Sequence, residues 1–473
     1  MLRPWKLQIK IDFKVETPIY IQIVNAIIEA IKSGKLQYGT ALPGSRKLAE
    51  LLNVNRNTVV KALGILTVEG WLISKQRKGV FVASDIPEIG SKTKVLNPSK
   101  YYKKEQTPLE IIFDDGIPDS KMAPMEELSR AYRRVFNQKS KWKLMGYYNE
   151  LGTLEFREAI AQMLSFKRGL NIATDHVAIT RGSQMAMYLA AQVLFSKGDA
   201  VIVENPGYIP AWKVFEKAGA TVIPVQTDNE GIRIDEIETI LNNNLNVKAV
   251  FVTPHHQYPT TVTMSLVRRL KLIDLSNTFG FTIIEDDYDH EFHFEQRPVL
   301  PISSHKEIQN YIYIGSMSKV VTPALRMGYL VSNTDFINKI SDLRKIIDVQ
   351  GDIIMELAVL DLIRSGDIRR HLKRATSHYR KKRAYFKQLL ETHLADKVTF
   401  EVPKGGLAFW IKPNKKVNNK KFHESLLKRN VDIITTNNFG NKSNKNISGL
   451  RIGYASLSSE KLKKGLIEIG KLL

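Results

Sequence analysis

A lysine flanked by hydroxyl groups is the first feature of this sequence that could do covalent chemistry. The segment Ser316-Met317-Ser318-Lys319 follows an apolar run, and Arg326 lies seven residues beyond the lysine. A lysine that forms a Schiff base must be fixed on a rigid element, and nearby hydroxyls and a cation can hold a cofactor phosphate. This spacing supplies all three groups.

Three further polar fragments follow apolar runs upstream. Ile284-Glu285-Asp286-Asp287-Tyr288 offers a carboxylate for a pyridine nitrogen and a phenol for a ring oxygen. A carboxylate keeps such a nitrogen protonated, which makes the ring a better electron sink. Gly182-Ser183-Gln184 is expected to open a helix, whose backbone donors suit a phosphate. Asn205-Pro206-Gly207-Tyr208 is suited to place an aromatic ring over the cofactor.

Each fragment alone is a weak signal, because a Ser-x-Ser-Lys segment is commonly a surface loop. The four fragments, however, each follow a predicted strand. Open α/β sheets bind ligands at the carboxyl ends of their strands. The set therefore predicts one shared pocket.

The elements that must position these residues are predicted by an alternation of apolar and helical segments from Ile111 onward. This alternation indicates an α/β fold with a mainly parallel sheet covered on both faces. The expected strands are 177–180, 200–203, 247–253, 281–284 and 311–314. After about Asp348 the pattern is helical and then strand-like, which predicts a smaller α/β subdomain over about 348–473 within a domain of 111–473.

The first 84 residues predict a separate helical domain with a hairpin. Apolar residues recur at helical spacing from Ile19 to Ile31. Ser45 is expected to cap a helix through Leu52, and Asn55 to cap a third helix after a tight turn. The inner stripe of the third helix is expected at positions 59, 62, 63 and 66. Runs at 71–74 and 80–82 predict a hairpin with a basic tip.

Two short helices joined by a tight turn and followed by a basic hairpin form a winged helix-turn-helix, whose third helix enters the major groove of double-stranded DNA. The domain is predicted over 13–84, with a linker at 85–110. Thirteen Lys or Arg against five Asp or Glu in residues 1–84, within a net charge of +22, agree with a polyanionic partner. The residues expected to contact DNA are Arg46, Arg56, Asn57, Thr58, Lys61, Arg77 and Lys78.

Composition excludes several other classes of protein. The sequence has no cysteine, which excludes disulfides and thiol catalysis. No apolar run approaches the length of a membrane-spanning helix, and no secretory signal is recognisable, so a cytoplasmic protein is expected. His290 and His293 resemble metal ligands, but the alternation of side chains along a strand argues against their convergence, and no metal is expected. The later basic run Arg380-Lys381-Lys382-Arg383 is interpreted as a solvated helix face.

The N-terminal motifs resemble the GntR-type winged helix over about residues 15 to 84. The resemblance rests on four segments: Leu42-Pro43-Gly44-Ser45-Arg46-Lys47-Leu48-Ala49, Val54-Asn55-Arg56-Asn57-Thr58-Val59, Glu69-Gly70-Trp71-Leu72 and Lys78-Gly79-Val80-Phe81-Val82.

The lysine fragments resemble the fold-type I aminotransferases, and more closely the MocR subfamily of GntR regulators. In that subfamily such a pyridoxal 5'-phosphate (PLP) domain follows a winged helix. The resemblance implies that Lys319 forms the internal aldimine, that Asp286 pairs with the ring nitrogen, and that Tyr288 and His256 lie near the ring oxygen. It implies that Tyr208 stacks on the ring and Arg451 grips a substrate carboxylate. The phosphate group would be held by Gly182, Ser183, Gln184, Ser316, Ser318 and Arg326.

The same resemblance implies a homodimer in which Tyr147 reaches the neighbouring subunit's cofactor. Two positions depart from the family pattern. Thr261 replaces a common glycine, and Pro210 lies where some relatives place a carboxylate-binding arginine.

Three functions share this pocket. The first is a transcriptional regulator whose effector, a small amine or amino acid, exchanges with Lys319 and shifts the protein between two arrangements. The second is a working aminotransferase that also binds DNA. The third, implied by the family, is a sensor of PLP itself. Turnover of an amino donor and a keto acid would favour the second, and DNA affinity that responds to PLP without an amine would favour the third.

Overall fold

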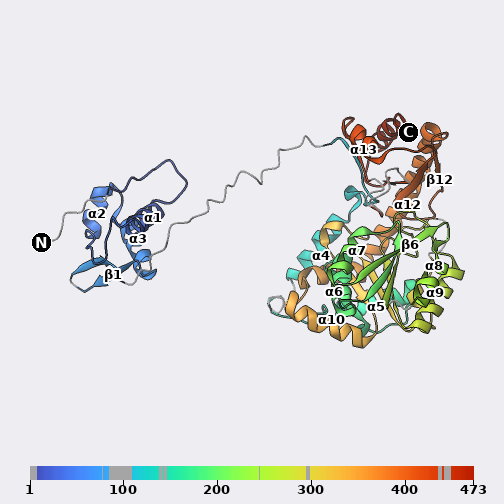
Figure 1. Cartoon of the computed structure of the whole chain (residues 1–473), viewed down its shortest axis with the longest axis horizontal. Helices are drawn as coiled ribbons and strands as arrows, with labels where there is room; N and C mark the ends of the chain where they lie inside the picture. Colours follow the sequence, from blue (N-terminus) through green and yellow to red (C-terminus); the bar gives the residue numbers. More distant parts are fainter. Residues whose placement is uncertain are drawn as a thin grey trace. The chain divides into compact units, whose positions relative to one another are not determined.

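The computed structural model describes residues 8–76, 78–84, 109–137, 142, 146–243, 246–294, 299–434, 439–440 and 449–473. The chain divides into two compact units, Met1–Gln106 and Thr107–Leu473. Figure 1 colours both along the sequence. Residues 85–108 of the predicted linker lie outside the described residues.

The N-terminal unit packs three helices against a two-stranded hairpin (Figure 1). The inner stripe predicted for the third helix is confirmed, because Val59, Ala62, Leu63 and Leu66 are all buried. They pack with the buried side chains of the first helix. The elements are α1 (Ile19–Lys32), α2 (Ser45–Leu52), α3 (Arg56–Val68), β1 (Leu72–Lys75) and β2 (Gly79–Val82).

The turn between α2 and α3 follows from its asparagines. Asn53 has a left-handed backbone with φ of 49°, which ends α2. The Asn55 side chain accepts a hydrogen bond from the amide of Asn57 at 2.8 Å, as predicted for an N-cap. The prediction that Ser45 caps α2 is wrong. Ser45 is already the first helical residue, and Gly44 is the N-cap without a side-chain bond.

An eight-stranded sheet forms the centre of the second unit, in the order β4-β11-β10-β9-β8-β5-β6-β7. Neighbouring strands from β10 to β6 run parallel, whereas β11 and β7 run antiparallel to their neighbours. The mainly parallel sheet is therefore confirmed. Its strands are β4 (Val177–Thr180), β5 (Ala200–Asn205), β6 (Thr221–Asp228), β7 (Gly231–Ile232), β8 (Val247–Val252), β9 (Thr282–Asp287), β10 (Tyr311–Ser316) and β11 (Gly328–Val331).

Helices cover both faces of this sheet because its strands are apolar on both sides. In β5, Val201 and Val203 pack with one set of helices, and Ala200 and Ile202 with the other. The first set is α6 (Ser183–Leu194), α7 (Ile209–Lys217) and α10 (Thr334–Ile347). The opposite face carries α4 (Met125–Asn137), α5 (Leu154–Arg168), α8 (Ile234–Asn242), α9 (Leu266–Phe279) and α11 (Ile353–Arg364). Figure 1 shows α8 and α9 together at one end of the sheet.

A smaller α/β core contains the end of the chain and one early strand. The strand β3 (Ile111–Phe113) pairs with β14 (Val431–Ile433), so the smaller core is not confined to residues after 348. Helix α11 instead packs on α4 and α5 in the large core. The remaining elements are the long helix α12 (Asp367–Leu394), β12 (Val398–Phe400), β13 (Ala408–Pro413), α13 (Asn419–Leu427), β15 (Leu450–Gly453) and α14 (Ser459–Gly470). Among the described residues, no helix combines the length and the apolar character needed to cross a membrane.

Candidate functional site

One cavity of about 170 Å³ gathers most of the residues singled out from the sequence. It lies at the carboxyl ends of parallel strands, because β9 ends beside Asp286 and β10 ends at Ser316. The lysine lies in the turn that follows β10, three residues beyond the end of the strand. The predicted residues that line the cavity are Ser183, Gln184, Tyr208, Asp286, Tyr288, Ser316, Ser318, Lys319 and Arg326.

Hydroxyl groups, a helix N-terminus and an arginine form one corner of this cavity. Ser183 is the first residue of α6, where free backbone N–H groups and the helix dipole favour an anion. The Ser316 hydroxyl accepts a hydrogen bond from the amide of Ser318 at 3.1 Å, and the buried Ser318 hydroxyl has no partner among the described residues. These donors match the oxygens of a phosphate.

Gly182 makes room for Arg326 in this corner. Its φ is +81°, and a Cβ atom added there would lie 2.6 Å from Nη2 of Arg326. Any other residue would therefore displace the guanidinium and also strain the backbone. Arg326 itself has a left-handed φ of 49° and donates to the carbonyl of Arg181 at 3.4 Å.

Asp286 presents a buried carboxylate with an unsatisfied oxygen. Its Oδ1 has no hydrogen-bond partner among the described residues. Burial, and then the nearby charge of Asp287, raise the pKa of Asp286 to about 8. A protonated ring nitrogen at this position would donate a hydrogen bond to the free Oδ1 of Asp286 and would supply a positive charge that stabilises the carboxylate. The free oxygen and the phosphate corner thus fit a pyridoxal phosphate.

Aromatic side chains form the wall around Lys319. The lysine Nζ lies 4.6 Å from the centre of the Tyr288 ring. The Tyr208 hydroxyl accepts a hydrogen bond from Nε2 of Gln184 at 2.7 Å, and its ring meets that of Tyr258 edge to face at 5.1 Å. Burial, followed by the charge of Asp286, raises the pKa of Tyr208 to about 12, so its hydroxyl keeps its proton.

Four predicted residues do not line the cavity. Gly182 supports it through Arg326, as described above. His256 is buried against Asp289, with Nδ1 and Oδ1 2.6 Å apart. Arg451 is 1% exposed and donates to the carbonyls of Asp115 and Pro259 and weakly to the Tyr288 hydroxyl. Tyr147 is 87% exposed.

Three lining residues were missed as site residues: Asp115, Thr253 and Tyr258. Thr253 directly follows β8, so the rule of strand ends applies to it as well. Tyr258 lies two residues beyond His256, which the family resemblance already singled out. Asp115 comes from the loop after β3, and no pattern in the sequence connects that loop with the large sheet.

His290 and His293 do not lie in a strand, contrary to the prediction. Strand β9 ends at Asp287, and His290 and His293 lie in the turn that follows, so strand alternation does not apply to them. Both line one cavity, which is separate from that of Lys319. No group of three or more His, Asp or Glu side chains suited to a metal ion is present in the described part of the chain.

The helix-turn-helix presents its expected DNA contacts at the surface. Arg46 on α2 and Arg56 and Asn57 at the start of α3 are exposed, and Thr58 is half-buried. Lys61 is exposed, but its ammonium lies 3.8 Å from the centre of the Tyr20 ring on α1. On the hairpin, Lys78 is exposed, and Arg77 lies outside the described residues.

Comparison with known families agrees with this geometry. Residues 116–469 match the model of aminotransferases of class I and II. The chain belongs to this family. Members of the family depend on PLP. Residues 19–82 match bacterial regulatory proteins of the gntR family, whose helix-turn-helix implies DNA binding.

Relatives with both parts carry regulatory names. The chain is 28% identical over 413 residues to the probable rhizopine catabolism regulatory protein MocR of Rhizobium meliloti, covering 84% of this chain and 82% of the relative. It is 27% identical to the uncharacterized HTH-type transcriptional regulator YdfD of Bacillus subtilis strain 168, covering 96% of each. The predicted MocR-like architecture is thereby confirmed.

A solved structure supports the fold of the second unit. The α-aminoadipate aminotransferase LysN of Thermus thermophilus, complexed with N-(5'-phosphopyridoxyl)-L-leucine, has a TM-score of 0.70 and 25% identity. The match covers 77% of this chain and 92% of that one. Fold type I, predicted from the lysine fragments, is confirmed.

Proposed function

We propose that this chain is a transcriptional regulator that binds operator DNA, holds PLP at Lys319 and responds to a small amine or amino acid. The observation that carries the proposal is the Lys319 cavity, in one chain with a gntR-type helix-turn-helix. PLP, when bound, supplies an aldehyde that amines attack and an electron-withdrawing ring. The proposed regulator acts in the cytoplasm, where bacterial operator DNA lies.

Different residues of the cavity would bind different parts of the cofactor. Lys319 would bind the aldehyde carbon of PLP covalently, while Asp286 would keep a proton on the ring nitrogen of PLP. The phosphate would be held by Ser183, Ser316, Ser318 and Arg326. Tyr208 and Tyr288 would orient the ring and help to exclude water, since both are half-buried and line the cavity.

A regulatory response requires an effector that prefers one arrangement of the protein to another. A Lys319 ammonium that is not bound to the cofactor would lie beside the Tyr288 ring, so occupation of the lysine would change the charge within the cavity. We propose a homodimer as the unit that responds. The exposed side chain of Tyr147 is then available to the other subunit's cavity.

The test uses the full-length protein, loaded with PLP and freed of excess cofactor. Lys319→Ala is expected to lose the visible absorbance of bound cofactor and the mass increment fixed by borohydride. Lys213→Ala, an exposed lysine on α7, is the matched control and keeps both. A borohydride-fixed cofactor in Lys319→Ala would refute the lysine assignment.

DNA binding is followed in parallel with a duplex selected from a random pool. The proposed function predicts that amines change the duplex affinity of the loaded protein while Lys319→Ala no longer responds. A response to PLP alone would identify the cofactor as the signal. Steady turnover of an amino donor and a keto acid, without any change in DNA affinity, would contradict the proposed regulatory function and would indicate that the chain is an aminotransferase.

A further inference from the structure

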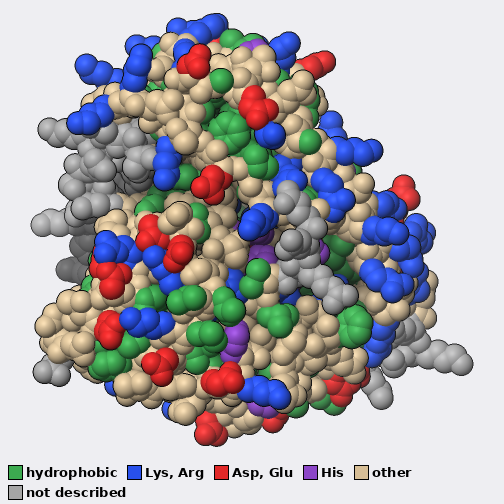
Figure 2. Space-filling model, turned by 90° about the vertical axis from the view of Figure 1, so that its right-hand side faces the viewer, with side chains coloured by type: hydrophobic (Ala, Val, Ile, Leu, Met, Phe, Trp, Pro, Cys, Tyr) green, Lys and Arg blue, Asp and Glu red, His purple; other side chains and the backbone are tan. Residues whose placement is uncertain are grey.

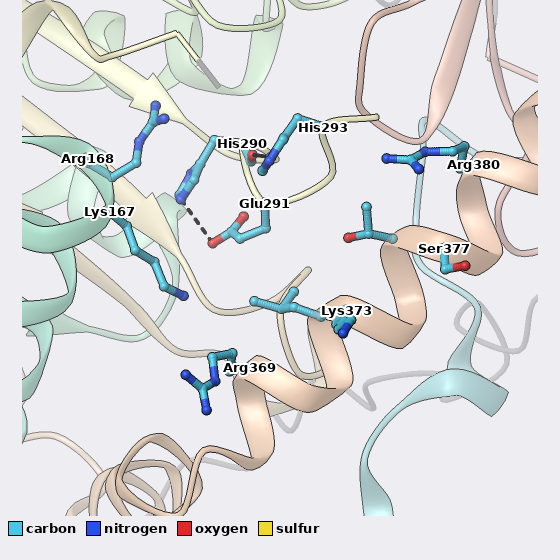
Figure 3. A pocket seen from close by; sticks show the side chains of 11 residues that line it. Lys167, Arg168, His290, Glu291, His293, Arg369, Lys373, Ser377 and Arg380 are labelled. Carbon is cyan, nitrogen blue, oxygen red and sulfur yellow. Dashed lines mark hydrogen bonds and ion pairs between the residues drawn. The ribbon is translucent and has the colours of Figure 1, made fainter. Parts of the chain in front are cut away.

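A second cavity, of about 590 Å³, lies between α5, α12 and the turn after β9. Ligand pockets commonly have volumes of about 300 to 1,000 Å³. Figure 3 shows Lys167 and Arg168 of α5 on one side and the side chains of α12 opposite. The histidines of the turn, His290 and His293, close the third side.

The side chains of α12 face this cavity because of their spacing. Arg369, Lys373, Ser377 and Arg380 recur every three or four residues, which puts them on one helical face. The basic run at Arg380 is therefore more than a solvated helix face. Two of its members bind elsewhere, since Lys382 donates to the carbonyl of Ala455 at 2.5 Å and Arg383 to that of Pro403 at 2.6 Å.

Four of the lining cations carry uncompensated charge. Lys167, Arg369, Lys373 and Arg380 are exposed, and none of them pairs with a carboxylate among the described residues. Figure 3 shows the Lys167 ammonium extending toward the middle of the cavity. Figure 2 shows Lys and Arg side chains gathered along one side of the same unit. Such a concentration of one charge attracts anions.

The other charged groups of the cavity are already paired. Arg168 turns away to Asp287, with Nη2 and Oδ2 2.5 Å apart. Glu291 lies 3.3 Å from Nε2 of His290, whose Nδ1 lies 3.3 Å from the Asp287 carboxylate. These contacts leave the four cations of α5 and α12 to a ligand. Residues 295–298, beyond the turn, lie outside the described residues.

The lining favours a phosphate among small anions. Arginine forks match the oxygens of a phosphate two at a time, and the Thr376 and Ser377 hydroxyls add further donors. The alkyl stems of the cations and Leu372 offer apolar surface for the rest of a small molecule. The hollow reaches the buried His290, so a small ligand can occupy its full depth.

We propose that this cavity binds a small organic phosphate of nucleotide size, at a second ligand site independent of the Lys319 cavity. Both cavities adjoin strand β9, because Asp286 lines one and Asp287 contacts the Arg168 and His290 that line the other.

The experiment is calorimetric titration of the full-length, PLP-loaded protein with inorganic phosphate, pyrophosphate, AMP and ATP. Saturable binding of at least one organic phosphate, one molecule per chain, is expected. Arg369→Gln combined with Lys373→Gln removes two of the four free cations, so affinity should fall about tenfold or more. Lys381→Gln removes an exposed cation of the same helix that does not line the cavity, and affinity should stay unchanged.

Folding of each variant is checked by its thermal midpoint, and Arg380→Gln alone provides a second, milder variant. Absence of saturable binding by all four probes would overturn the proposal. An equal loss in Lys381→Gln would also overturn it, since the binding would then follow overall charge. Binding of a short DNA duplex that weakens in the double variant, without any small phosphate bound, would assign this face to DNA instead.

Discussion

Asp286 and Asp287 are adjacent in β9, and their carboxylates have opposite surroundings. Asp286 lines the Lys319 cavity, and burial raises its pKa to about 8. Asp287 is equally buried, but the Arg168 guanidinium and His290 hold its pKa well below the ordinary value. Side chains alternate along a strand, so Asp286 and Asp287 point to opposite faces of the sheet. Asp286 retains its proton on one face, and Asp287 remains a carboxylate anion on the other.

The first prediction concerns the pH dependence of Asp286. An unfolded aspartate titrates near pH 4, whereas folded Asp286 titrates at about pH 8. Its contribution to the stability of the cofactor-free protein is therefore fully present below about pH 4 and is lost as the pH rises through about 8. Asp286→Asn removes this loss. We expect the variant to have a higher midpoint of thermal unfolding than the wild type at pH 8.

At pH 3 to 4 the same two proteins should unfold at similar temperatures, because Asp286 is then protonated in the folded state and largely protonated in the unfolded state as well. Measurement is by differential scanning calorimetry of the cofactor-free protein at both pH values. An Asp286→Asn midpoint that is raised equally at both pH values would contradict the assigned pKa.

The second prediction concerns the buried pair beneath β9. Arg168→Met removes the guanidinium from Asp287, which is 1% exposed and keeps only His290 and the Tyr313 hydroxyl as partners; this should cost about 3 to 5 kcal/mol of unfolding free energy. Denaturant unfolding followed by circular dichroism measures this cost. Lys271→Met, which breaks an exposed pair with Glu238, is the control and should change little. Equal effects of the two substitutions would contradict a special role of the buried pair.

Much of the Lys319 cavity is predictable because its residues follow single strands, and strand ends of one direction share an edge. The apolar runs around positions 284 and 314 are enough to place Asp286 beside Ser316. Asp115 is not predictable in this way, since β3 belongs to the small core and only the fold brings its loop to Tyr258. The buried position of Arg451 likewise depends on three acceptors from distant segments, which no local spacing indicates.

The third prediction concerns the start of α3. Arg56 is exposed beside Asn57 at the first turn, and we expect it to contact DNA. Arg56→Ala should weaken binding to the selected duplex about tenfold, without changing cofactor uptake. Fluorescence anisotropy at several salt concentrations measures the affinity, which should fall as salt rises because neutralised phosphates release counterions. Lys35→Ala, an exposed cation outside α2, α3 and the hairpin, is the control; a comparable loss there would argue against recognition by α3.

The fourth prediction concerns Thr261, which stands where the family commonly has glycine. Its φ is +66°, a left-handed conformation that β-branched residues rarely adopt. The backbone is held there because the Thr261 amide donates to the carbonyl of Gln257 at 2.7 Å. Thr261→Gly should therefore raise the unfolding free energy by about 0.5 to 1 kcal/mol, as relief of strain exceeds the entropy cost of glycine.

Thr261→Ala is the matched control, because alanine keeps a Cβ atom and should gain less. Both variants are compared with the wild type by urea unfolding. A lower stability of Thr261→Gly than of Thr261→Ala would show that the loop tolerates its threonine without strain.

The fifth prediction extends the proposed function to the kind of effector. The Asp115 carboxylate lines the cavity and accepts a hydrogen bond from the Tyr258 hydroxyl at 3.3 Å. Three nitrogens of Arg451 already donate hydrogen bonds within the chain. The Asp115 carboxylate is therefore more readily available to an incoming molecule than the Arg451 guanidinium is. We therefore expect a diamine to perturb the visible spectrum of the PLP-loaded protein at lower concentration than a dicarboxylic amino acid does.

Asp115→Asn should reduce this preference about tenfold, because a charge-assisted hydrogen bond is lost. Asp119→Asn, in the same loop but outside the cavity, should keep the preference; a wild-type protein that favours the dicarboxylic acid would show that Arg451 is released to bind it.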